Sequence, residues 1–257
     1  MDLSYQEQHD KLSVRIRAHK EFANFDISDW LDEHLAKRRR RQIFDLCCGN
    51  GNHLGIYLRH AGAEGSVCGL DRETKLIEEA KERYRDASNL HLTIGSMDDP
   101  LPYENESFDT CLSLFAIYNS SDPAKLIQEI RRVMQPGTEL ILVAPTVNSA
   151  KEIYEYNERL TGQAIDDVTL IRTDRLRQEI LPIVKEAFAD VSTELLDSCL
   201  TFPNRDEFIR YFQATMLYEQ VAMKQEVSRE QMEAACGDDE TPLLSKEMLA
   251  VIATKES

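Results

Sequence analysis

The sequence predicts an α/β protein built on a doubly wound, mostly parallel sheet. Between residues 41 and 145, short apolar runs alternate with longer stretches of helical periodicity. A glycine-rich turn follows the first apolar run, and an aspartate ends the second. Right-handed crossovers join such strands into a parallel sheet, and ligands bind beyond the carboxyl ends of its strands.

Each element of this region follows from a local pattern. Asp122 and Pro123 form a helix cap and a first-turn proline, and the helix that they begin runs to Met134. The other helices expected here span 53–60 and 73–84. The expected strands span 43–47, 67–71, 90–94, 108–115 and 139–144.

The alternation breaks after residue 145. A strand (191–202), a helix (205–224) and a last strand (247–254) close the chain, within one extended domain over 41–257. We expect residues 1–40, which are amphipathic and helical, and the charged insertion 146–188 to form a helical lid. We expect the polar, poorly patterned segment 225–239 to form a mobile loop.

The composition argues against several classes of function. The chain has 257 residues, of which 42% are apolar, and no run approaches the ~18 apolar residues of a membrane span. The N-terminus lacks the features of a secretory signal, so we expect a cytoplasmic protein without a membrane partner. A net charge of −16 opposes binding to nucleic acid, and we interpret the basic run 37–41 as a solvated helix end.

The six cysteines show no pattern of metal ligands or disulfides. None forms a C-x-x-C pair, and no histidine lies at a metal-binding spacing from a cysteine. Cys47 and Cys48 are adjacent, which makes a bridge between them strained. We therefore expect free thiols and no metal site.

The turn after the first strand gives the first signal of a binding site. Gly49 and Gly51 flank Asn50 and let the backbone approach a ligand, and the next helix presents unpaired N–H groups there. Asp71 ends the second strand about 20 residues later, where a carboxylate can accept both hydroxyls of a ribose. The alternative for Asp71 is a cap on the following helix.

The turn departs from the pattern that binds dinucleotides. That pattern, G-x-G-x-x-G, requires a third glycine where this chain has Leu54. Asp45 precedes the turn, and a carboxylate there suits a ligand with an ammonium group better than one with two phosphates. These features favour S-adenosylmethionine over NAD.

Taken in order along the chain, residues 40–146 resemble class I S-adenosylmethionine-dependent methyltransferases, in the branch that acts largely on small molecules. The resemblance implies a Rossmann-like sheet of seven strands, mostly parallel with an antiparallel last strand, and S-adenosylmethionine as cofactor. Cys47 replaces the usual first glycine of the turn, and Ser96 replaces a frequent acidic residue. The segments that resemble the family are Ile43–Gly51, Cys68–Arg72, Gly95–Tyr103, Phe108–Asn119 and Asp122–Gly137.

The resemblance also implies roles for individual residues. Asp71 would bind the ribose, Arg72 would stack on the adenine, and Asp98 or backbone groups would take over adenine recognition from Ser96. The complete set assigned to the cofactor is Asp45, Cys47, Gly49, Asn50, Gly51, Asp71, Arg72, Ser96, Met97, Asp98, Leu114 and Phe115.

Candidates for the acceptor side follow the fourth strand and lie on the flanking helices. Tyr118 and Asn119 come where the transferred methyl should project, although Tyr118 is equally a loop aromatic that packs on the next helix. His19 is a candidate base, with a solvated or core histidine as the alternative. Five later aromatics either line a substrate pocket or belong to a core: Tyr154, Tyr156, Tyr211, Phe212 and Tyr218.

We therefore expect an enzyme that moves a methyl group from S-adenosylmethionine to an oxygen or nitrogen nucleophile of a small molecule by direct SN2 displacement. The alternatives are a protein side-chain methyltransferase, a non-catalytic S-adenosylmethionine-binding regulator and, less favoured, an NAD-dependent dehydrogenase. Strand four does not end in the N-P-P-Y signature, which argues against nucleobase amino groups as acceptors. The sequence specifies neither the acceptor nor the oligomeric state.

Overall fold

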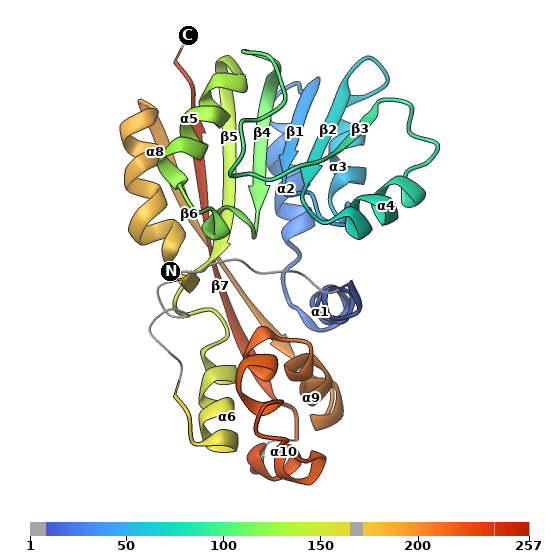
Figure 1. The fold of residues 1–257 in the computed structure, drawn as a ribbon, viewed down its shortest axis with the longest axis vertical. Coiled ribbons are helices and arrows are strands. Elements are labelled where there is room, and N and C mark those ends of the chain that lie inside the picture. The colour runs from blue at the N-terminus through green and yellow to red at the C-terminus, as the bar shows by residue number, and fades with distance from the viewer. Residues whose placement is uncertain (1–8, 165–171, 239, 257) are drawn as a thin grey trace.

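The computed structural model describes residues 9–164, 172–238 and 240–256. A seven-stranded sheet of order β3-β2-β1-β4-β5-β7-β6 organises them (Figure 1). Strands β1 to β5 pair in parallel, and β7 runs antiparallel to both β5 and β6. This confirms the expected seven-stranded, mostly parallel fold with an antiparallel last strand. The strands are β1 (Gln42–Leu46), β2 (Ser66–Asp71), β3 (Leu90–Ile94), β4 (Phe108–Leu114), β5 (Met134–Pro145), β6 (Asp190–Thr201) and β7 (Leu243–Thr254).

The strand order reverses between β1 and β4. Phe44 of β1 lies beside Cys68 of β2 on one side and beside Cys111 of β4 on the other. The chain therefore leaves β1 and β4 in opposite directions, and a crevice for a ligand opens at their carboxyl ends. This reversal places the glycine-rich turn after β1 at that crevice.

Helices cover both faces of the sheet, because its parallel strands are apolar on both sides. Residues at the centre of the sheet, such as Phe44 and Leu142, are fully buried. One face packs against α5 (Pro123–Val133), η2 (Leu176–Ile180) and α8 (Leu181–Ala187). The other packs against α2 (Ile27–Ala36), α3 (Leu54–Ala61) and α4 (Thr74–Arg83).

A separate hydrophobic core lies beyond the carboxyl ends of the parallel strands, at the lower end of Figure 1. We call this part the cap. Its centre is aromatic, with Tyr156, Phe202 and Phe212 almost completely buried. The cap consists of the adjoining ends of β6 and β7 together with α1 (His9–Phe22), α6 (Lys151–Thr161), α9 (Arg205–Gln213), η3 (Tyr218–Ala222) and α10 (Arg229–Ala235).

The two segments expected to form a lid each divide between the cap and the sheet. Within residues 1–40, α1 contributes Ala18 to the cap core, whereas α2 contributes Leu31 and Leu35 to the core behind the sheet. Within 146–188, α6 belongs to the cap, whereas η2 and α8 pack on the sheet. The lid therefore stays a prediction that concerns α1 and α6.

The expectation of a mobile loop over 225–239 is wrong for its central part. Helix α10 begins after Ser228, whose side chain accepts a hydrogen bond from the Gln231 N–H, while the Gln231 side chain accepts one from the Ser228 N–H. Met232 anchors the helix in the cap core. This capping box was present in the sequence, but the helix buries too few apolar residues to show a clear periodicity. Residue 239 lies outside the described residues.

The basic run 37–41 is not solvated along its whole length. Arg40 is 3% exposed, and its guanidinium donates to Glu139 Oε2 at 2.6 Å and to Thr110 Oγ1 at 3.2 Å. A buried guanidinium requires a carboxylate partner, and this one comes from β5. Arg38 and Arg41 have exposed side chains, as expected for a solvated helix end.

Two further properties concern the described residues as a group. None of the described helices combines the length and apolar content needed to cross a bilayer. The described part of the chain also holds no group of three or more histidines, cysteines, aspartates or glutamates arranged to bind a metal. All six cysteines are free thiols.

Candidate active site

The turn after β1 is held against β2 by backbone hydrogen bonds. The N–H groups of Cys47 and Cys48 both donate to the carbonyl oxygen of Leu70, at 2.7 and 3.1 Å. Cys47 has a φ of 64°, in the left-handed region that favours glycine. Cys47 therefore keeps the backbone shape of the glycine that the resemblance leads one to expect there.

The two glycines of the turn serve different purposes. Gly49 has a φ of +54°, and a Cβ there would meet no atom within 4 Å, so the space beside it is open. Gly51 has a φ of +79°, and a Cβ there would lie only 2.8 Å from Leu54 and 3.1 Å from Tyr84. Packing therefore requires Gly51, whereas Gly49 leaves room for a ligand. Asn50 between them is buried.

Tyr84 stabilises this turn through two hydrogen bonds, a role that the sequence did not suggest. Its hydroxyl donates to the carbonyl of Gly51 at 2.9 Å and accepts from the N–H of Gly55 at 3.1 Å. It thus satisfies one of the unpaired N–H groups at the start of α3. In the sequence Tyr84 fits the apolar spacing of the helix 73–84, and nothing there marks a partner for its hydroxyl.

Asp71 reaches from the end of β2 to the turn. Its Oδ2 accepts from the Gly49 N–H at 2.8 Å, and its Oδ1 accepts from the Glu73 N–H at 2.9 Å. Burial raises its pKa even though these hydrogen bonds oppose the shift. Glu73, not Asp71, occupies the cap position of α4. The carboxylate therefore joins β2 to the turn.

Asp45 is a buried carboxylate without a hydrogen-bond partner among the described residues. It is 5% exposed, and burial, followed by the charge of Asp71, raises its pKa to about 8. The nearby hydroxyl of Tyr57, which we did not anticipate, is also buried without a partner in the described chain, and burial and the charge of Asp45 raise its pKa. Two unsatisfied polar groups beside an open turn indicate a place for a polar ligand.

The loop after β3 is joined to the loop after β4 through Asp98. The Oδ1 atom of Asp98 accepts from Ser120 Oγ at 2.8 Å and from the Ser121 N–H at 2.9 Å. Ser96 Oγ accepts from the Asp98 N–H at 3.1 Å, and Met97 packs on the neighbouring core. The three residues expected near adenine therefore form one connected loop.

Arg72, Leu114 and Phe115 lie at the ends of β2 and β4. The side chain of Arg72 is half exposed and forms an ion pair with Glu73 at 3.4 Å. Leu114 packs against the core on the α2–α4 face, whereas Phe115 is exposed and has a φ of 57°. A left-handed φ at a bulky residue is strained, and such strain is concentrated at functional sites. It turns the chain sharply into η1 (Ile117–Asn119).

Two arginines that the sequence did not mark hold the candidate acceptor residues in place. Arg172 donates to Asn119 Oδ1 at 2.6 Å and lies 5.9 Å from the centre of the Tyr118 ring. Arg175 is buried and donates to the carbonyl oxygens of Tyr118 at 2.9 Å and Ser120 at 2.5 Å. These contacts join residues more than fifty positions apart, so no local pattern could reveal them.

His19 lies in the cap, apart from the network around the turn. Its ring contacts Tyr211 edge-to-face, with 6.2 Å between the ring centres. The surrounding protein, followed by the positive charges of Lys246 and Arg15, lowers its pKa well below the usual value. The ring is therefore neutral at pH 7, although part of its surface remains accessible to solvent.

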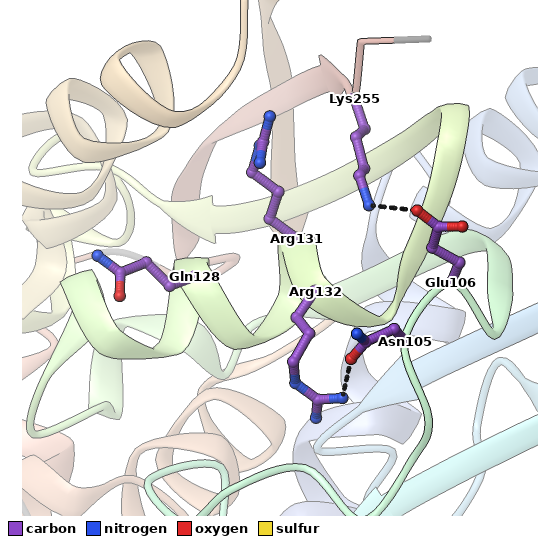
Figure 2. A pocket seen from close by; sticks show the side chains of 6 residues that line it. All are labelled: Asn105, Glu106, Gln128, Arg131, Arg132 and Lys255. Atoms are coloured by element: carbon purple, nitrogen blue, oxygen red, sulfur yellow. Dashed lines mark hydrogen bonds and ion pairs between the residues drawn. The ribbon is translucent and has the colours of Figure 1, made fainter.

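A cavity of about 270 Å³ lies at the end of the sheet that is remote from the turn (Figure 2). Lys255 pairs with Glu106 at 3.8 Å, and Arg132 donates to Asn105 at 3.1 Å. Because this cavity lies near the amino ends of β4 and β5, it is not where such folds bind ligands. Its lining comprises Asn105, Glu106, Gln128, Arg131, Arg132 and Lys255.

The part of the chain that contains the turn matches proteins of known family. Residues 37–188 match the family of methyltransferase domains. A demethylmenaquinone methyltransferase of Staphylococcus haemolyticus (strain JCSC1435) is 26% identical over 178 residues, which cover 67% of this chain and 66% of that protein, slightly less than two thirds. One from Staphylococcus aureus (strain MRSA252) is 25% identical over 185 residues, which cover 70% and 68%.

Solved structures share the fold at lower identity. The YcgJ protein from Bacillus subtilis is 13% identical with a TM-score of 0.62, over 90% of this chain and 98% of that one. A SAM-dependent methyltransferase from Aquifex aeolicus is 12% identical with a TM-score of 0.55, over 96% and 98%. Because the matched family spans more than half of the chain, this protein belongs to the methyltransferase domain family and is a class I S-adenosylmethionine-dependent methyltransferase.

Proposed function

We propose that this enzyme transfers the methyl group of S-adenosylmethionine to an oxygen or nitrogen nucleophile of a small molecule. The observation that carries the proposal is the pair of buried carboxylates, Asp45 and Asp71, beside the open turn at Gly49. The names of the curated relatives support a small-molecule acceptor, because those proteins are named for demethylmenaquinone.

The residues around the turn fit S-adenosylmethionine. The partnerless carboxylate of Asp45 would pair with its ammonium group, and Asp71 would accept the ribose hydroxyls with the lone pairs that Gly49 and Glu73 leave free. The loop that contains Asp98 would border the adenine. When bound, the cofactor supplies a sulfonium methyl that is already activated for direct SN2 displacement.

The acceptor would lie between the end of β4 and the cap. Tyr118 and Asn119 would contact it, and Arg172 and Arg175 hold both residues in position. Precise placement of the nucleophile provides most of the catalysis in such a transfer. His19, which is neutral at pH 7, is available to accept a proton from a nucleophile that arrives protonated. Helices α1 and α6 would shield this space from water as a lid.

The fate of a labelled methyl group tests this proposal. The protein is incubated with S-adenosylmethionine labelled in its methyl group, together with either a small-molecule extract or a protein extract. We expect label in the small-molecule fraction, strongly reduced in Asp71→Ala and unchanged in Asp86→Ala, which alters an exposed aspartate. Label confined to protein would contradict the proposal and favour a protein side-chain methyltransferase. Cofactor binding without any transfer would favour a non-catalytic regulator.

A further inference from the structure

The cap gathers positive charge around the ring of Tyr211. Arg15 and His19 lie one helical turn apart on α1. The Nζ atom of Lys246, on β7, lies 5.9 Å from the centre of the Tyr211 ring, and the His19 ring lies 6.2 Å from the same centre. The three basic side chains therefore come together from two elements that are far apart in the sequence.

This cluster adjoins the candidate acceptor residues through the segment that follows α9. Arg15 donates to the carbonyl oxygen of Ala214 at 3.4 Å, so α1 contacts that segment. Two residues further along, Met216 contacts Arg172 through its Sδ atom at 3.3 Å, and Arg172 donates to Asn119. The segment thus links Arg15 to the end of β4, and Arg172 provides the second of these contacts.

Within this cluster, Lys246 lacks the kind of ion pair that other basic side chains of the cap form. Lys11 pairs with Glu219, Arg17 with Glu207, and Arg229 with Asp206. Lys246, by contrast, is half-buried and forms no ion pair with a carboxylate of the described residues. A basic side chain without a carboxylate partner is unexpected in a chain of net charge −16, in which acidic residues outnumber basic ones.

We propose that the methyl acceptor is an anion, and that Lys246, assisted by Arg15, binds its carboxylate or phosphate group while its nucleophile lies beside Tyr118 and Asn119. This inference rests on the proposed function and adds the charge of the substrate to it. The same protein then uses carboxylates to hold a cationic cofactor and ammonium or guanidinium groups to hold an anionic acceptor. Such complementarity also orients the acceptor, because its charged end is fixed in the cap.

The test follows His19 by NMR in the full-length protein saturated with S-adenosylhomocysteine. The ring resonances of His19 are assigned from their loss in His19→Asn. The probes are inorganic phosphate, benzoate and uncharged benzamide, at constant ionic strength. We expect saturable shifts with a roughly millimolar Kd for at least one anion and none for benzamide. The anion that binds more tightly identifies the charged group of the acceptor as a phosphate or a carboxylate.

Three variants show whether Lys246 is responsible. Lys246→Met should weaken anion binding about tenfold, which is the scale of a lost charged hydrogen bond, and Lys246→Arg should restore most of it. Lys224→Met changes an exposed lysine of the same cap and should have no effect. Equal binding by wild type and Lys246→Met, an equal response to benzamide, or no saturable shift with either anion would overturn the inference. Calorimetry of S-adenosylhomocysteine binding separates these outcomes from a failure of the proposed function.

Discussion

The sheet provides acidic side chains to the proposed site, and the cap provides basic ones. The sheet contributes Asp45 and Asp71, two buried carboxylates whose pKa values are raised. The cap contributes Lys246 and Arg15, together with His19, whose pKa is lowered by burial first and then by these two charges. In the proposed function, the two parts of the molecule have separate tasks. The sheet would bind the cofactor, which is common to the family, and the cap would bind the acceptor.

The largest expected effect tests whether the two parts are energetically separate. Phe212→Ala removes a fully buried ring from the cap core and should destabilise the cap by about 3–5 kcal/mol. Hydrogen exchange should then accelerate in the cap, and methyl transfer should fall, while the affinity for S-adenosylmethionine is retained. Phe44→Ala is the matched change in the sheet core and should reduce both methyl transfer and the affinity for S-adenosylmethionine. A parallel loss of cofactor affinity in Phe212→Ala would show that the parts are not separate.

The second prediction concerns the carboxylates of the sheet. Asp45→Asn and Asp71→Ala should each weaken S-adenosylmethionine binding by about 1–3 kcal/mol, the scale for a lost charged hydrogen bond. Calorimetric titration measures the change, with Asp86→Ala as the control. Anion binding by the cap should be the same in all three variants. If either change left the dissociation constant for S-adenosylmethionine unaltered, that residue would have to be removed from the binding site.

The third prediction is a pH dependence with a definite sign. In the folded protein Asp45 keeps its proton up to about pH 8, whereas the unfolded chain loses it near pH 4. The free energy of unfolding should therefore fall as the pH rises from 4 to 8. Binding of an ammonium group requires the ionised form, so cofactor affinity should rise by up to about tenfold per pH unit toward pH 8.

Asp45→Asn provides the control for this pH dependence. Both slopes should become shallower in that variant, and Asp71, whose pKa is also raised, accounts for what remains. Thermal unfolding and calorimetry at several pH values measure the two slopes. A cofactor affinity that decreases from pH 6 to pH 8 in the wild type would contradict the assignment of Asp45.

The smallest expected effect concerns the shape of the turn. Tyr84→Phe removes the hydroxyl that joins the Gly51 carbonyl to the Gly55 N–H, at a cost of about 1 kcal/mol. S-adenosylmethionine affinity should fall a few-fold, and the cap should not respond. Tyr103→Phe is a suitable comparison, because it removes a buried hydroxyl that forms no hydrogen bond with the turn. Equal effects of the two changes would mean that the hydroxyl of Tyr84 does not shape the turn.

The sheet could be predicted from the sequence because its signals are local. The turn at Gly49–Gly51 and Asp71 lie at strand ends that apolar runs mark clearly, and the structure places them together. Tyr84 and Tyr57 were missed because an aromatic residue at helical spacing is usually a core residue, and periodicity says nothing about the partners of its hydroxyl. Helix α10 shows a signal that was present but overlooked, namely the capping box at Ser228.

The cap could not be predicted as a unit, because three separate parts of the chain build it. Lys11 of α1 pairs with Glu219 of η3, 208 residues away. The amphipathic patterns of α1 and α6 are equally compatible with packing on the sheet, where α2 and α8 pack. The arginines that hold Tyr118 and Asn119 belong to the same class of long-range contacts.

The most direct test of the central claim is calorimetric titration of the wild type and Asp45→Asn with S-adenosylmethionine and, separately, with NAD. We predict micromolar binding of S-adenosylmethionine by the wild type, no binding of NAD, and a clear loss of S-adenosylmethionine affinity in the variant. Tight binding of NAD, or equal S-adenosylmethionine affinity in the two proteins, would contradict the claim that Asp45 and the turn at Gly49 hold the methyl donor.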